Sequence, residues 1–244
     1  MANTNTLYRY STISALLSGI CTEGLDASTL LERGTYGIGT FSDLDGEIIV
    51  IDSRAYHFPS TTNTVRRLNP TATIPFAMLT TFQPTHTLPL PTTTTSEKIT
   101  LKSLSALLTP LLDTNKNTFL SLRLTTTFAS LTTRIIPRRG SPQETLADCA
   151  ARQKVTNHGR SRGTLFGFWS PAYTVGIGVP GFHLHFLSED GENGGHVLDF
   201  EGEGRGLEVA VLREVRLELP DTREFGEVEV KAPSAEMVRG AEGG

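Results

Sequence analysis

The chain has few cysteines and no long apolar run, and each of these shortages excludes a class of protein. Only Cys21 and Cys149 occur among 244 residues, which is too few for a disulfide framework and lacks the paired spacing of a zinc knuckle. We expect both to be reduced thiols of a cytoplasmic protein. No apolar stretch is long enough to span a bilayer, and the N-terminus lacks the basic start and apolar core of a secretory signal.

An excess of positive charge is also missing. The chain carries 22 Lys and Arg against 26 Asp and Glu, for a net charge of −4, so it has no general attraction to nucleic acid or acidic membranes. Hydrophobic residues make up 38% and charged residues 20%, a balance typical of soluble globular proteins. We therefore expect a soluble protein with a buried core and with neither a nucleic acid nor a membrane as partner.

Helical periodicity is confined to a few short segments. Leucines at helical spacing predict the best helix at residues 101–112, with Pro110 bending or shortening its last turn. Shorter helices are expected at residues 11–17, 26–33 and 143–153.

Most other segments have the character of strands. An Asp45–Gly46 turn joins strand candidates at residues 36–41 and 47–52. Residues 119–124 and 128–136 alternate like two paired strands. Beyond Gly163 the candidates are residues 165–169, 174–179, 182–187, 196–200 and 207–219.

These patterns predict an α+β fold dominated by sheet, in one compact unit. Residues 1–162 are expected to form a mixed sheet with helices starting at Ser11 and Leu101. Residues 163–244 are expected to form an antiparallel, barrel-like region, and the polar tail from Ala232 to be poorly packed unless something holds it.

Three of the six histidines gather between residues 181 and 200. His183 and His185 share one face of a predicted strand, because side chains alternate along it. A hairpin centred between Asp190 and Gly191 would place His185 opposite His196, where cross-strand Cβ atoms lie about 4.5–5.5 Å apart. Three neutral histidines form a catalytic ligand set for zinc that leaves one position open. Paired strand histidines also occur simply as hydrogen-bonding groups in a polar cleft.

Around these histidines the sequence resembles the α-acetolactate decarboxylase family. The similar segments are FHLHF (182–186) and GGHVLDF (194–200), YGIGTF (36–41) followed by LDGE (44–47), IPFA (74–77), Thr133-Arg134, and GFWSPAY (167–173). They come in the family's order, and the resemblance spans residues 7–222. It implies conversion of the small molecule 2-acetolactate to acetoin and carbon dioxide through a metal-stabilised enediolate.

The same resemblance implies a metal centre. His183, His185 and His196 take the place of the family's three metal ligands. The metal would act as a Lewis acid on the substrate's ketone and hydroxyl oxygens. We expect zinc, although three histidines also suit iron, nickel or copper. No organic cofactor is needed, because the substrate's own ketone accepts the electrons, and a homodimer joined through sheet edges is expected.

Four further residues match positions that serve catalysis in the family. Arg134 is expected to grip the substrate carboxylate, Glu47 to help protonate the enediolate, and Thr40 to lie near the substrate. The family also uses a glutamate from its C-terminal tail, for which Glu242 is the best match and Glu236 competes.

Other interpretations of these residues stay open. His183 and His185 followed by Glu189 approximate a cupin metal motif, but no histidine follows His196 to build the second cupin motif. A homologue that has lost its activity is another alternative, with the unusual residues 58–97 as the place where decay would show. Without the family match, Arg134 would be interpreted as a surface residue beside Arg138 and Arg139.

Overall fold

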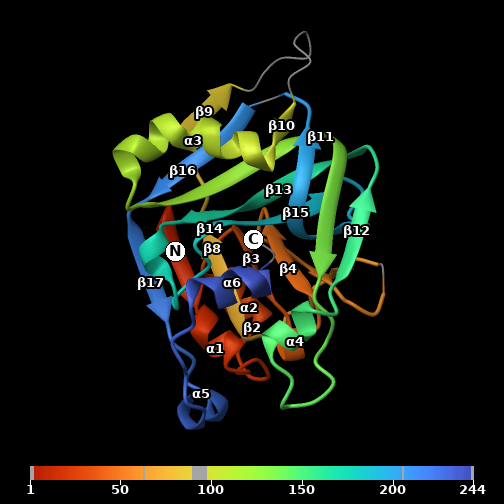
Figure 1. Cartoon of the computed structure of the whole chain (residues 1–244), viewed down its shortest axis with the longest axis vertical. Helices are drawn as coiled ribbons and strands as arrows, with labels where there is room; N and C mark the ends of the chain where they lie inside the picture. The colour runs from red at the N-terminus through yellow and green to blue at the C-terminus, as the bar shows by residue number, and fades with distance from the viewer. Residues whose placement is uncertain (1–2, 63, 90–97, 205, 243–244) are drawn as a thin grey trace.

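Two layers of β-sheet dominate the molecule. The computed structural model describes residues 3–62, 64–89, 98–204 and 206–242, with the backbone alone for Glu242. In Figure 1 the barrel strands cross the upper part of the molecule, α1, α2 and α4 lie in the lower part, and α6 is drawn near the middle. The described helices are α1 (Ile13–Leu17), α2 (Ala27–Leu31), α3 (Leu101–Asn115), α4 (Leu146–Ala150), α5 (Arg223–Glu227) and α6 (Ala235–Glu242), with 3-10 turns at Ser42–Leu44 and Ala172–Thr174.

The first layer is a mixed seven-stranded sheet. Its order is β17 (Glu214–Glu218), β1 (Thr6–Tyr10), β8 (Phe76–Thr80), β3 (Tyr36–Thr40), β4 (Glu47–Ile51), β5 (Arg54–Phe58) and β6 (Arg66–Arg67). β17 runs parallel to β1, and the other neighbours are antiparallel. Both the mixed sheet and the Asp45–Gly46 connection between β3 and β4 are confirmed. A separate small sheet pairs β2 (Leu25–Asp26) with β7 (Thr73–Ile74).

The second layer is an antiparallel barrel, as the sequence predicts. Four strands close on one another because β15 pairs with β11 as well as with β14: β11 (Phe119–Ile135), β13 (Ser161–Ser170), β14 (Gly181–Ser188) and β15 (Gly194–Gly202). The same sheet also contains β9 (His86–Pro89), β10 (Ile99–Thr100), β12 (Lys154–His158) and β16 (Gly206–Leu212).

The long helix α3 packs against the barrel. Thr100 and Ser103 form a capping box that fixes its start. Leu104, Leu108 and Leu111 are buried in one core with barrel leucines and phenylalanines. The helix continues past Pro110 to Asn115, so the proline does not shorten it as expected.

Three strand predictions are wrong. Residues 174–179 form the end of a 3-10 turn and an isolated bridge instead of a strand, and two other predictions differ in their boundaries. Residues 119–136 do not form two paired strands, because β11 is a single strand of 17 residues with a bulge between Phe128 and Ser130. Its length lets one end pair with β16 and the other with β12 and β15. Residues 207–219 divide at Arg213, where the chain leaves the barrel sheet as β16 and enters the other sheet as β17.

A hydrophobic core joins the two layers. Ile38, Ile49 and Met78 of the seven-stranded sheet lie in one buried cluster with Phe166 and Phe168 of the barrel. Each sheet also takes a strand from the other predicted region. The barrel contains β11, which precedes residue 163, and the seven-stranded sheet contains β17, which follows it. The division into regions 1–162 and 163–244 stays a prediction.

Helices α4 and α6 form a third packed region at one end of the molecule. Val238 and Ala241 of α6 are buried with Leu146 and Cys149 of α4. The sequence predicted that the tail would be poorly packed unless something held it. These contacts with α4 hold it in place. Cys149 and Cys21 are both free thiols in this same cluster, and within the described residues no helix is long and apolar enough to cross a membrane.

Candidate active site

The three clustered histidines converge between the two layers. His185 pairs directly with His196 across the β14–β15 hairpin, as the turn-centred register predicts. On β14 the side chains of His183 and His185 alternate with Leu184 and Phe186, which lie in the barrel core. One ligand atom from each of the three histidines lies within 4.8 Å of the others, and all three residues are buried.

The electrostatic surroundings keep the imidazoles of His183 and His185 neutral. Burial, with smaller contributions from the charges of Arg134 and Arg9, lowers the pKa of His183 to about 3. Burial also lowers the pKa of His185 well below its usual value, aided by His183 and Arg134. Neutral imidazole is the form that binds a metal ion, so these histidines are in their ligand form at neutral pH.

The protonation of His185 is fixed by a backbone contact. Its Nδ1 lies 2.8 Å from the carbonyl oxygen of Ile48 on β4. A carbonyl only accepts, so Nδ1 carries the proton and Nε2 carries the lone pair. Such a hydrogen bond from the second ring nitrogen is what orients metal-binding histidines. Nε2 lies 3.8 Å from Oε2 of Glu47, and three neutral nitrogen donors beside a carboxylate fit a divalent metal ion.

Glu47 and Thr40 reach the site from the seven-stranded sheet. They are cross-strand partners at the β3–β4 turn, and Glu47 is buried on the same face of β4 as Ile49 in the interlayer core. Gly46 has a φ of +88°, and a Cβ there would lie 1.9 Å from the carbonyl oxygen of Phe58. Only glycine fits this turn, which directs Glu47 between the layers.

Arg134 comes to the site from the barrel. It lies opposite His196 in the β11–β15 pairing and is 1% exposed, so the alternative of a surface arginine is wrong. Its Nη1 donates to the carbonyl oxygen of Ala241 at 2.6 Å and to Oε1 of Gln153 at 3.3 Å. The first contact brings the end of α6 to Arg134.

The tail glutamates have different positions. Glu236 is exposed on the first turn of α6. The side chain of Glu242 lies outside the described residues, although its neighbour Ala241 contacts Arg134. Glu242 is therefore next in sequence to a residue that contacts Arg134, and the role of either glutamate in the site stays a prediction.

Arg9 and Glu189 are two residues whose place relative to the site could not be decided from the sequence. Arg9 on β1 is fully buried and was not predicted as a site residue, although its alternation with Tyr8 and Tyr10 places it on the face of the apolar Leu7. Glu189, the ligand that a cupin would use, is exposed at the hairpin turn, and Arg162 Nε lies 3.1 Å from its Oε1.

Comparison with known proteins decides the family. The model of the α-acetolactate decarboxylase family matches residues 7–232. This chain belongs to that family. The α-acetolactate decarboxylase of Brevibacillus brevis is 35% identical over 243 residues, which cover 98% of this chain and 81% of the relative. That of Methylococcus capsulatus is 33% identical and covers 97% of this chain and 88% of the relative.

Solved structures agree with the sequence relatives. The crystal structure of α-acetolactate decarboxylase from Bacillus subtilis strain 168 superposes with a TM-score of 0.90 at 30% identity, covering 98% of this chain and all of that one. A Staphylococcus aureus protein described as similar to α-acetolactate decarboxylase gives 0.89 at 29% identity, with 98% and 100% coverage. The resemblance seen in the sequence motifs is confirmed, and the cupin alternative is excluded.

Proposed function

We propose that this protein decarboxylates 2-acetolactate to acetoin and carbon dioxide. The observation that carries the proposal is the convergence of three buried histidines in a member of this family. Relatives about 30–35% identical over nearly the whole chain have the name of this activity. Glu47 and Arg134 lie next to the histidines, from opposite layers.

The histidines would hold the metal ion that this chemistry uses. His183, His185 and His196 would bind it through neutral ring nitrogens, and we propose zinc because an all-histidine set without thiolate is typical of catalytic zinc sites. When bound, a divalent cation supplies Lewis-acid stabilisation for the negative charge that develops on the substrate as carbon dioxide leaves.

Arg134 would hold the substrate carboxylate before it leaves. A guanidinium presents a planar fork of donors that matches a carboxylate. Its contacts with Ala241 and Gln153 fix the side chain from the α6 and α4 side. This orientation keeps the carboxylate next to the histidines without a rearrangement at the moment of reaction.

Glu47 would deliver the proton that replaces carbon dioxide. A guanidinium does not release its proton under ordinary conditions, so the carboxyl group of Glu47 is the better donor, directly or through water. Its position on one side of the site would favour a single face of the substrate. Thr40, its cross-strand partner, would contact the substrate beside it, and Glu242 would supply a second carboxyl group from the tail.

We further propose a cytoplasmic homodimer. Exposed Val215, Leu217 and Leu219 lie on or directly after β17, the edge strand of the seven-stranded sheet. An apolar sheet edge of this kind pairs readily with a second copy. The buried free thiols of Cys21 and Cys149 support the reducing cytoplasm as its location.

The test measures metal content and acetoin formation on the same preparation. We expect about one equivalent of metal per chain, as one set of histidines provides, and acetoin from racemic 2-acetolactate. Chelation should abolish acetoin formation and zinc should restore it. Bound metal without acetoin would point to a homologue that has lost its activity. Acetoin formation by fully metal-free protein would contradict the role given to the histidines.

A further inference from the structure

Arg9 is a buried charge that the reaction described above does not use. The residue is 0% exposed, and Nη2 donates to the carbonyl oxygen of Ile177 at 3.1 Å. Its Nε and Nη1 are buried without a hydrogen-bond partner among the described residues. Burial lowers the pKa of Arg9 to about 10, so the guanidinium is still charged at neutral pH.

The strand directs this charge between the two layers. Arg9 lies on the same face of β1 as Leu7, which belongs to the interlayer core. Across the sheet Arg9 pairs with Met78, which lies in that core with Phe168. Gly178 gives the guanidinium its space, because a Cβ there would lie 2.3 Å from Nη2.

Arg9 also lies on the face of the seven-stranded sheet that carries Glu47. Cross-strand pairing joins Arg9 through Met78 and Ile38 to Ile49 on β4, and Glu47 precedes Ile49 by two residues on that strand. Arg134 lies on the barrel strand β11 and Arg9 on β1 of the facing sheet. Two buried cations therefore come from the two facing layers.

The local balance of charge calls for an anion. Within the described part of the chain, no carboxylate forms an ion pair with Arg9. An uncompensated buried charge is strongly unfavourable, and buried donors without an acceptor add a further cost. An anionic ligand that accepts from Nε and Nη1 would remove both costs.

We propose that Arg9 is a second carboxylate-binding residue of the site, which contacts the substrate's carboxylate from the seven-stranded sheet while Arg134 contacts it from the barrel. The proposal rests on the proposed function for its substrate, a small 2-hydroxy acid. It assigns Arg9 to binding and orientation, without a part in proton transfer.

The test compares a charged with a neutral ligand by calorimetry on the zinc-loaded protein. The charged probe is 2-hydroxy-2-methylbutanoate, which lacks the ketone and does not decarboxylate, and the neutral probe is acetoin. In Arg9→Gln we expect the Kd for the carboxylate to rise about 10- to 100-fold, the range for loss of hydrogen bonds to a charged group. The Kd for acetoin should stay within about twofold, because acetoin has no carboxylate for Arg9 to bind.

Two further variants separate binding from folding. Arg9→Lys keeps the positive charge but lacks the planar pair of donors of a guanidinium. Its Kd for the carboxylate should therefore lie between those of wild type and Arg9→Gln. It also serves if Arg9→Gln does not fold. Arg216→Gln, on the neighbouring strand β17 with an exposed side chain, is the matched control and should bind both probes like wild type.

The outcomes also separate this proposal from the proposed function. An unchanged Kd for the carboxylate in Arg9→Gln, or equal weakening of both probes, would overturn the role of Arg9 even if acetoin is formed normally. Selective loss of carboxylate binding in a protein that makes no acetoin would retain the role of Arg9 and reject the decarboxylase. Wild-type protein that binds no carboxylate would reject the role of Arg9 as well.

Discussion

Two regions of this molecule bury arginine side chains, and they differ in whether acidic side chains neutralise the positive charge. Around Arg139 the chain supplies the acidic partners itself. Around the three histidines, Arg9 has no acidic partner among the described residues, and the counter-charge proposed above is that of a ligand. The contrast separates a buried cation that holds the fold from one that binds a substrate.

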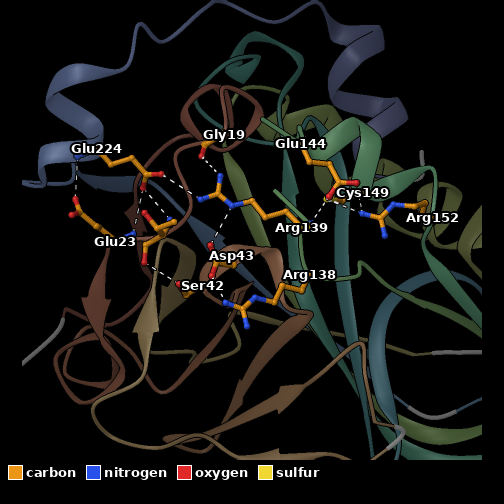
Figure 2. Close-up of polar contacts among 12 residues, drawn as sticks. Gly19, Glu23, Ser42, Asp43, Arg138, Arg139, Glu144, Cys149, Arg152 and Glu224 are labelled. Atoms are coloured by element: carbon orange, nitrogen blue, oxygen red, sulfur yellow. Dashed lines mark hydrogen bonds and ion pairs between the residues drawn. The ribbon is translucent and has the colours of Figure 1, made fainter. Parts of the chain in front are cut away.

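The Arg139 region joins four segments that are distant in sequence (Figure 2). Arg139 donates from Nε to Asp43 Oδ1 at 3.2 Å and from Nη1 to the carbonyl oxygen of Gly19 at 3.1 Å. Its Nη2 lies 3.8 Å from Glu224 Oε1, and Glu224 Oε2 accepts from the backbone N–H of Thr22. Each charge has its partner within the chain, so the network needs no ligand.

In the histidine region, unlike the Arg139 region, buried positive groups outnumber the acidic side chains among the described residues. Three buried imidazoles, two of them kept neutral by burial, lie in the same interlayer region as two buried guanidinium groups and the carboxylate of Glu47. A metal ion adds further positive charge. Such a site is costly to fold and gains its stability from an anionic ligand, which is the arrangement expected where function takes precedence over stability.

The largest effect on activity should come from removing a histidine, because this change disrupts the region proposed to bind the metal and the substrate. We expect His185→Ala to lose the metal and to reduce acetoin formation by more than about 100-fold, because changes in a ligand's supporting shell alone cost 10- to 100-fold. The measurements are metal content and acetoin formation, with circular dichroism to confirm the fold. The exposed His86→Ala is the matched control. A His185→Ala protein with full metal content would contradict the site.

A smaller effect, on stability alone, should come from disrupting the Arg139 network. Arg139→Met leaves Asp43 and Glu224 without their buried partner, and we expect the free energy of unfolding to fall by about 2–3 kcal/mol, below the range for fully buried pairs. Activity per folded molecule should not change, because the network lies outside the histidine site. Urea unfolding monitored by fluorescence measures the first quantity, and acetoin formation the second.

The neighbouring arginine provides the control for this variant. Arg138 also contacts Asp43, at 2.7 Å, but its side chain is 61% exposed against 7% for Arg139. Arg138→Met should therefore cost less than about 1 kcal/mol, as exposed ion pairs do. Equal losses of stability in the two variants would show that burial does not distinguish them and would remove the basis of the comparison.

Much of the site could be predicted from sequence because it depends on local rules. The turn residues Asp190 and Gly191 fix the register that pairs His185 with His196, and strand alternation places His183 on the same face. The Asp45–Gly46 turn likewise places Glu47 at the start of a buried strand. Short-range patterns were enough for these residues.

Features that depend on long-range packing were not predictable in the same way. Arg9 looks like any polar residue of an alternating strand, and its burial arises only because the barrel covers that face of the sheet. The helical tail gives a weak local signal and is ordered by the apolar contacts of Val238 and Ala241 with α4. The long strand β11 also depends on partners at both ends, which no local pattern reveals.

The smallest effect is expected at Glu189, an acidic residue that is near the histidines in sequence but lies in the exposed hairpin turn. Glu189 follows His185 by four residues, yet it is exposed at the hairpin turn and pairs with Arg162, also exposed. Glu189→Gln should keep its metal content and acetoin formation, and its stability should change by less than about 1 kcal/mol, because exposed pairs contribute little. Loss of metal in this variant would mean that the turn folds back onto the histidines. In that case Glu189 would join Glu47 as a carboxylate of the chain beside the histidines, and the contrast with the Arg139 network would weaken.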